Sequence, residues 1–172
     1  MRILLSTRWL LPCLLPLAAL LGASTPPKPT AYVFLAPTCP ISQAVTPEVR
    51  RLAADYGARG IQFVGVFPDV TLSEAERTRF GRDYLLKFTL QADPGQLLAW
   101  RLGATITPEA AVTDAAGALL YRGRINDQYA RLGVRRTVVQ RHELADALAA
   151  VAAGRPVAVP RTEAVGCLIE LP

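Results

Sequence analysis

The sequence predicts an α/β fold in which a central mixed β-sheet is flanked by helices on both faces. Two short apolar runs, 31–36 and 61–67, are rich in aromatic and β-branched residues, which is typical of buried strands. The first run is followed by apolar residues at helical spacing, and the second by a helix-opening capping pattern. A hairpin pattern then surrounds the turn at 114–117. A parallel pair followed by a hairpin places both strand directions in one sheet.

Local signals along the chain define the individual elements. Ser73, with Glu76 three residues later, forms a capping-box pattern that opens the second helix. Gly57 or Gly60 ends the first helix, and Gly103 ends the third. The predicted strands span residues 31–36, 61–67, 88–92, 105–112 and 118–124. The predicted helices span residues 42–57, 73–86, 95–102 and 141–153.

Residues 1–24 predict a secretory signal peptide. Arg2 and Arg8 supply its positive region, an apolar run covers 9–21, and the small residues of 21–24 suit a signal peptidase. The run is shorter than the roughly 20 apolar residues of a membrane span, and an uncleaved anchor is the alternative. Cleavage predicts a periplasmic or secreted protein with no stable membrane insertion.

Residues 25–156 then form a single domain, and 157–172 form a C-terminal extension. Because two of the 19 basic residues lie in the signal, its loss lowers the formal charge from +5 to +3. The remaining basic residues are scattered, apart from short clusters such as Arg135-Arg136. This pattern indicates a solvated surface and not a nucleic-acid-binding face.

Cys39 is the main candidate for a reactive group. It stands where a strand ends and a helix begins, in the segment Ala36-Pro37-Thr38-Cys39-Pro40-Ile41-Ser42. The first amides of a helix have no intrahelical partner, and the helix dipole adds positive potential there. Both effects stabilise a thiolate, which is the nucleophilic form of cysteine. Pro40 is compatible with the first helical position, and a buried, inert thiol is the alternative interpretation of Cys39.

Several segments resemble a known family. The run from Cys39 to Ser42 resembles the Cys-X-X-Cys site of thioredoxin-like proteins, and Thr107-Pro108 resembles their cis-proline segment. Residues 121–127 and 166–169 are similar to an exported redoxin group related to the alkyl hydroperoxide reductase/thiol-specific antioxidant (AhpC/TSA) proteins. The resemblance implies a thioredoxin-like fold for 25–156, with a cis Pro108 that faces Cys39 and the substrate.

The chain departs from that family at the second cysteine. Ser42 stands in its place, and a serine hydroxyl cannot resolve a mixed disulfide. After loss of Cys13 with the signal, the other cysteine is Cys167, in the C-terminal extension. Three interpretations of Cys167 stay open: a distant resolving cysteine, half of a disulfide with Cys39, or an unpaired residue in a mobile tail.

The predicted function is that of an exported thiol–disulfide oxidoreductase that uses Cys39 as nucleophile, with Cys167 as a possible resolving partner. Its expected substrates are protein thiols and disulfides, small thiols or peroxides, and no organic cofactor is required. One alternative is a non-catalytic binding module or copper metallochaperone on the same fold. Another is a thiol peroxidase, although Ala36 replaces the threonine that peroxiredoxins carry three residues before their reactive cysteine.

Five residues are candidate substrate contacts near the catalytic candidates Cys39, Cys167 and Pro108. They are Thr38, Pro40, Ser42, Thr107 and Arg124. Arg124 would lower the pKa of a nearby thiolate or orient an anion, and the alternative is a local ion pair with Asp127.

Structural interpretations are favoured for the remaining polar and apolar candidates. Glu109 is expected to be a structural or solvated carboxylate, with an acid/base role as the alternative. His142, in the first turn of the last helix, is expected at the surface, because its spacing to the cysteines has no metal-site signature. Trp100, Leu97 and Leu98 are expected to pack in the core.

Overall fold

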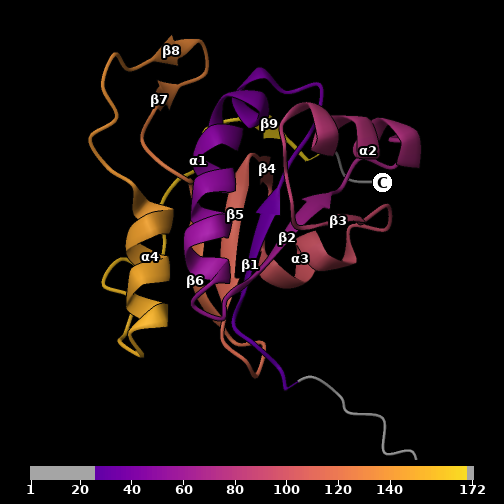
Figure 1. Cartoon of the computed structure of the whole chain (residues 1–172). Coiled ribbons are helices and arrows are strands. Elements are labelled where there is room, and N and C mark those ends of the chain that lie inside the picture. The colour runs from indigo at the N-terminus through magenta and orange to yellow at the C-terminus, as the bar shows by residue number, and fades with distance from the viewer. Residues whose placement is uncertain (1–25, 170–172) are drawn as a thin grey trace, which may run out of the picture.

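A five-stranded mixed sheet lies at the centre of the computed structural model, which describes residues 26–169 (Figure 1). The strand order is β3-β2-β1-β5-β6. Strands β1, β2 and β3 are parallel, while β5 runs antiparallel to both β1 and β6. The strands are β1 Thr30–Phe34, β2 Gln62–Phe67, β3 Thr89–Ala92, β5 Glu109–Thr113 and β6 Leu119–Gly123. The predicted mixed sheet is confirmed, with β3 as an edge strand.

Helices cover both faces of this sheet, as predicted. Along β1, Val33 points into the larger apolar cluster with side chains of α1, α2 and α4, whereas Phe34 points into a second cluster with α3. This alternation follows from the two-residue period of a strand. The helices are α1 Pro40–Gly57, α2 Glu74–Asp83, α3 Leu97–Leu102 and α4 Glu143–Ala152.

Helix α1 accommodates a proline in its interior. Pro47 has no N–H to donate to the carbonyl of Gln43, one turn earlier. The hydroxyl of Thr46 donates to that carbonyl instead, at 2.8 Å. The helix therefore continues through Pro47 to Gly57.

Helices α2, α3 and α4 are shorter than predicted. The capping box of Ser73 and Glu76 opens α2 as expected, but Leu85 adopts a positive φ of 55°, so the helix ends before it. His142 is the N-cap of α4 and not a first-turn residue, because the backbone becomes helical only at Glu143. The predicted strand over 105–112 is divided by a cis Pro108 into β4, Ile106–Thr107, and β5.

The prediction that α3 packs fully in the core is wrong. Trp100 is 83% exposed and Leu97 is 75% exposed, while Leu98 packs partly against the second cluster. A helix of six residues presents only one narrow face to the sheet, and Ala99 and Leu102 occupy it.

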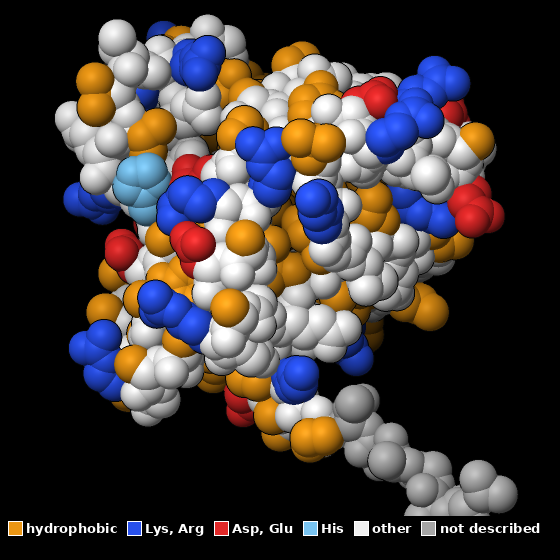
Figure 2. Space-filling view, in the orientation of Figure 1, with side chains coloured by type: hydrophobic (Ala, Val, Ile, Leu, Met, Phe, Trp, Pro, Cys, Tyr) orange, Lys and Arg blue, Asp and Glu red, His pale blue; other side chains and the backbone are white. Residues whose placement is uncertain are grey.

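Three short strands complete the described chain. Strands β7, Tyr129–Arg131, and β8, Val134–Arg135, form a hairpin apart from the main sheet (Figure 1). Strand β9, Cys167–Leu168, pairs with β4 and was not predicted. Lys and Arg side chains are spread over the face shown in Figure 2, with acidic residues among them.

The predicted signal peptide, residues 1–24, lies outside the described residues. Within residues 26–169, no helix combines the length and apolar character needed to cross a membrane.

Candidate active site

Cys39 occupies the junction predicted from the sequence, between β1 and α1. It is the N-cap of α1, and its carbonyl accepts the first helical hydrogen bond, from the amide of Gln43, at 3.1 Å. Its own amide donates to the carbonyl of Ala36 at 3.0 Å. Its side chain is only 1% exposed. The fold therefore places the thiol at the start of a helix but beneath the surface.

Ser42 supports the loop that precedes Cys39. Its hydroxyl accepts a hydrogen bond from the amide of Ala36 at 3.2 Å, and the residue is fully buried. Gln43 binds the same loop, because its side-chain amide donates to the carbonyl of Pro37 at 2.7 Å. The candidate contacts Thr38 and Pro40, by contrast, are exposed beside the thiol.

The Thr107–Pro108 peptide bond is cis, which confirms the prediction made from the family resemblance. The carbonyl oxygen of Thr107 lies 3.3 Å from Cys39 Sγ. Pro108 itself is buried and lines a small cavity with Ile41 and Arg124. The backbone of Thr107 thus faces the sulfur directly.

The C-terminal extension brings Cys167 to the same place. Strand β9 runs antiparallel to β4, with Cys167 opposite Thr107. The amide of Ile169 donates to the carbonyl of Thr105 at 2.9 Å, and the Thr107 hydroxyl donates to the carbonyl of Cys167 at 3.3 Å. The two thiols are free, and Cys167 Sγ donates to Cys39 Sγ at 2.7 Å. Cys167 therefore lies in a paired strand and not in a mobile tail.

A glycine permits this close approach. A methyl group on Gly166 would lie 2.7 Å from the carbonyl carbon of Thr107 and closer still to its oxygen. Both atoms belong to the backbone of the cis-proline segment, so they cannot move aside freely. In the sequence, residues 166–169 carry part of the family resemblance and Cys167 is a candidate resolving cysteine, but nothing there indicates that position 166 requires a glycine.

The surroundings shift the pKa values of the two thiols in opposite directions. Burial disfavours the Cys39 thiolate, but hydrogen bonds from Cys167 Sγ and from the amides of Ser42 and Ile41 outweigh it and lower the pKa of Cys39. Burial, the hydrogen bond to Cys39 and the negative charge of its thiolate raise the pKa of Cys167 to about 11. Of the two sulfurs, Cys39 is therefore the one that ionises first.

Comparisons with known proteins support the fold. No protein-family model and no curated protein sequence matches the chain. An uncharacterized conserved protein from Geobacillus kaustophilus is 26% identical, over 85% of this chain and 78% of that chain, with a TM-score of 0.73. MTB DsbF is 28% identical, over 73% of this chain and 81% of that chain, with a TM-score of 0.53. The chain belongs to the thioredoxin-like superfamily.

A third neighbour shares the fold. It is a secreted disulfide oxidoreductase of Mycobacterium tuberculosis, described as homologous to E. coli DsbE. It is 22% identical, over 72% of this chain and 81% of that chain, with a TM-score of 0.53. The closer relationship to AhpC/TSA proteins stays a prediction.

In this thioredoxin-like chain, Glu109 anchors the cis-proline segment. It is 4% exposed, and its Oε2 accepts hydrogen bonds from the amides of Thr105 at 2.9 Å and Ile106 at 3.3 Å. Its Oε1 lies 3.4 Å from Nε of Arg122, which also donates to the carbonyl of Gly103. The structural interpretation of Glu109 is therefore confirmed, and Arg122 is a partner that the sequence did not reveal.

The alternative interpretation of Arg124, a local ion pair with Asp127, is wrong. Arg124 pairs with Glu143 at the start of α4, with its Nε 2.7 Å from Oε1. Asp127 instead accepts from the amides of Gln140 and Arg141 and pairs with Arg136 at 3.6 Å. These partners come from a chain reversal after β6, so sequence proximity was a poor guide to pairing.

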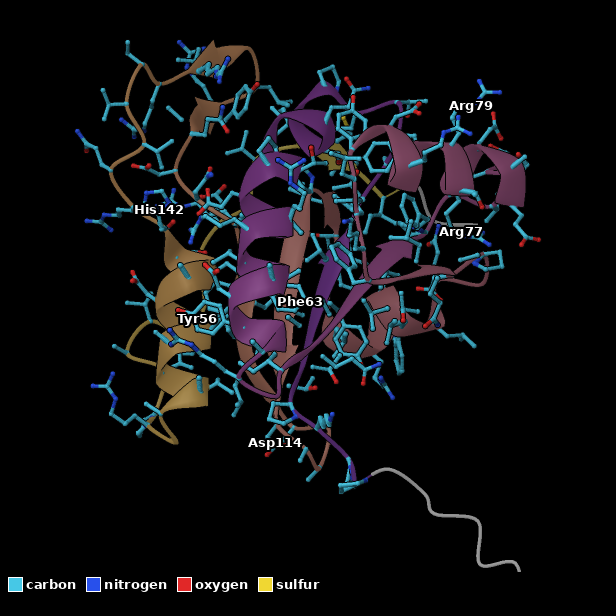
Figure 3. All side chains as sticks on the ribbon, viewed as in Figure 1. Tyr56, Phe63, Arg77, Arg79, Asp114 and His142 are labelled. Atoms are coloured by element: carbon cyan, nitrogen blue, oxygen red, sulfur yellow. The ribbon has the colours of Figure 1, made fainter. Side chains whose placement is uncertain are left out.

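His142 lies at the N-terminal end of α4, as Figure 3 shows. It is exposed, and its Nδ1 is 2.7 Å from Oε1 of Glu48 on α1. Among residues 26–169, no group of three or more His, Cys, Asp or Glu side chains is arranged to hold a metal ion. The described residues therefore offer no observation in favour of the metallochaperone alternative.

Proposed function

We propose that this chain is an exported thiol–disulfide oxidoreductase in which Cys39 is the nucleophile and Cys167 is its resolving partner. The observation that carries the proposal is the 2.7 Å approach of two sulfur atoms from residues 128 positions apart. The predicted signal at 1–24 and the secreted Mycobacterium tuberculosis neighbour support export to the periplasm or beyond. Residues 25–156 form the redoxin domain in this proposal, and 157–172 the extension that supplies the second sulfur.

The proposed reaction begins at Cys39. Its thiolate attacks one sulfur of a substrate disulfide, forms a mixed disulfide and releases the other substrate sulfur as a thiolate, which takes up a proton. Cys167 then loses its proton to solvent and attacks Cys39 Sγ. The bond between Cys39 and the substrate breaks, and its electron pair leaves with the second substrate sulfur. The substrate disulfide is thereby reduced to two thiols, and the protein is left with a Cys39–Cys167 disulfide.

The position of β9 sets the order of these events. Cys39 is buried, and Cys167 is paired with Thr107. This pairing occupies the backbone edge of β4 that an extended substrate segment would otherwise use. A protein substrate therefore reaches Cys39 only after β9 leaves this edge. The return of β9 brings Cys167 back to the mixed disulfide. Since Ser42 has no sulfur and is fully buried, the resolving step depends on this strand.

The main rival is a permanent structural disulfide between the same residues. Such a bond would close a loop of about 130 residues and stabilise the fold by roughly 4–5 kcal/mol in the chain-entropy model. In that case dithiothreitol would reduce the bond only as the protein unfolds. The lowered pKa of Cys39 favours the exchange reaction, because a low-pKa sulfur is a good leaving group.

Reduction of insulin disulfides, with dithiothreitol as the electron donor, tests the proposal. The mature protein should accelerate the reaction, and Cys39→Ser should abolish the acceleration. Without dithiothreitol, Cys167→Ser should accumulate a mixed disulfide on Cys39 that peptide mass spectrometry detects. Activity of Cys39→Ser equal to that of the native protein would refute the proposal.

A further inference from the structure

The two sulfurs of the candidate site differ in their access to solvent. Cys39 is 1% exposed, whereas Cys167 belongs to the exposed residues of β9. In a protein that carries the Cys39–Cys167 disulfide, an external thiolate has a choice of two sulfurs to attack. Access and leaving-group pKa determine which sulfur reacts. With β9 in place, access favours Cys167.

A cavity of about 360 Å³ adjoins Cys167. This volume is within the range of about 300–1,000 Å³ that is usual for small-molecule sites. Cys39 is not part of its wall. Its wall includes Thr38, Asp69, Val70, Thr71, Cys167 and Leu168.

The cavity wall carries a negative charge. Among the described residues that line it, Asp69 is the one charged side chain. Thr71 orients this carboxylate, because its amide and hydroxyl both donate to Oδ1, at 2.8 and 2.7 Å. The rest of the wall is apolar or carries uncharged hydrogen-bonding groups. A cationic or neutral ligand therefore fits this wall better than an anionic one.

We propose that small neutral or cationic thiols enter this cavity and reduce the oxidised protein by attack on Cys167 Sγ. The inference rests on the proposed function, since it requires the Cys39–Cys167 disulfide. In the first step, the thiol's sulfur bonds to Cys167, the protein disulfide breaks, and its electron pair goes to Cys39 as a thiolate. A second molecule of the same thiol then attacks the small-molecule sulfur of the mixed disulfide. Cys167 is released and protonated, and the two small thiols leave as their disulfide.

The pKa values of Cys39 and Cys167 also favour attack of the small thiol on Cys167. The sulfur that leaves in the first step is Cys39, whose pKa is lowered, while the pKa of Cys167 is raised to about 11. A thiol of lower pKa leaves faster in disulfide exchange. Reduction by small thiols and exchange with protein disulfides thus use different sulfurs: Cys167 for the first, and Cys39 for the second.

Trapping the first adduct tests which sulfur reacts. The oxidised mature protein is mixed with 2-aminoethanethiol, quenched at short times with acid, unfolded and alkylated with excess iodoacetamide, and mapped by peptide mass spectrometry. The expected product carries 2-aminoethanethiol on Cys167 and a carbamidomethyl group on Cys39. The reverse distribution at the earliest times would overturn the inference.

A charge series tests the cavity. The first-step rates of 2-aminoethanethiol, 2-mercaptoethanol and mercaptoacetate should fall in that order when each is expressed per thiolate, divided by the rate of the same thiolate with a small uncharged disulfide, and compared at low salt. The expected decrease is about threefold for each unit of charge at a solvent-exposed carboxylate. In Asp69→Asn, which keeps Oδ1 as an acceptor for Thr71, the three rates should converge. An unordered series in the native protein, or an unchanged order in Asp69→Asn, would overturn the assignment of the cavity.

Failure of this inference is distinct from failure of the proposed function. An adduct on Cys39 would remove the role of the cavity and leave the insulin activity and its dependence on Cys39 intact. If the proposed function itself is wrong, the insulin assay shows no acceleration that depends on Cys39, whichever sulfur the small thiol attacks. The mass of the starting material shows separately whether the Cys39–Cys167 disulfide is present before any thiol is added.

Discussion

Replacement of Gly166 by alanine should expose Cys39. The added methyl group would lie 2.7 Å from the carbonyl carbon of Thr107, whereas unstrained carbon atoms pack at about 3.5–4.0 Å. Strand β9 must therefore retreat from β4 by roughly 1 Å. Such a shift breaks hydrogen bonds that depend on close pairing, and it separates Cys167 from Cys39.

The magnitude follows from the bonds that hold β9. Besides its strand pairing, β9 is held by the bond from the Ile169 amide to the Thr105 carbonyl and by the bond from the Thr107 hydroxyl to the Cys167 carbonyl. Each hydrogen bond contributes about 1 kcal/mol net, so the loss of two disfavours the docked strand by about 2 kcal/mol. That free energy corresponds to an increase of about 30-fold in the undocked population.

The assay is alkylation of the reduced protein by iodoacetamide at fixed pH, with the modification of Cys39 followed by peptide mass. Gly166→Ala should accelerate this reaction by about 30-fold or less, because alkylation of buried Cys39 requires β9 to undock. Gly57→Ala is the matched control, since a methyl group there meets nothing within 4 Å. Equal rates for the native protein, the control and Gly166→Ala would refute the idea that β9 shields Cys39.

Two further predictions concern the same site. In Cys167→Ala, loss of the hydrogen bond from Cys167 Sγ should raise the pKa of Cys39, so the pH midpoint of its alkylation moves upward; an unchanged or lower midpoint would contradict this account. In Glu109→Ala, the amides of the cis-proline segment and Arg122 lose their buried partner, which should lower the free energy of unfolding in urea by about 3 kcal/mol. Glu163→Ala, at an exposed position, is its control and should change that free energy by less than about 0.5 kcal/mol.

Features with a local cause were predictable from the sequence. The break between an apolar strand and a helix at Cys39 is visible in a few residues, because proline and the change of periodicity mark it. The capping box at Ser73 depends on a spacing of three residues and forms as expected. The cis form of Pro108 was predicted from the family resemblance, since most X-Pro bonds are trans.

Features that depend on distant partners were not predictable in this way. Strand β9 is two residues long and carries no strand pattern, because its pairing is determined by the β4 edge and by the small size of Gly166. Arg124 has an acid three residues away in Asp127, yet it pairs with Glu143 after the chain turns back. Trp100 is a large aromatic residue of the kind usually found in a core, but α3 is too short to bury more than one face.

The structure explains together why a serine stands at position 42 and why the second sulfur of the site, Cys167, lies on β9. The site of a second Cys-X-X-Cys sulfur is held by Ser42, which is fully buried and accepts a hydrogen bond from the loop before Cys39. A thiol is a weaker acceptor than a hydroxyl, so this position is suited to support of the loop. The second sulfur must then come from outside α1. Strand β9, paired with β4 at Thr107, brings Cys167 Sγ within 2.7 Å of Cys39 Sγ. Because the same strand covers Cys39 and carries Cys167, any exchange that opens the site for a protein substrate also withdraws the resolving sulfur. In the proposed reaction, docking of β9 therefore separates the step in which the substrate binds from the step in which it is released.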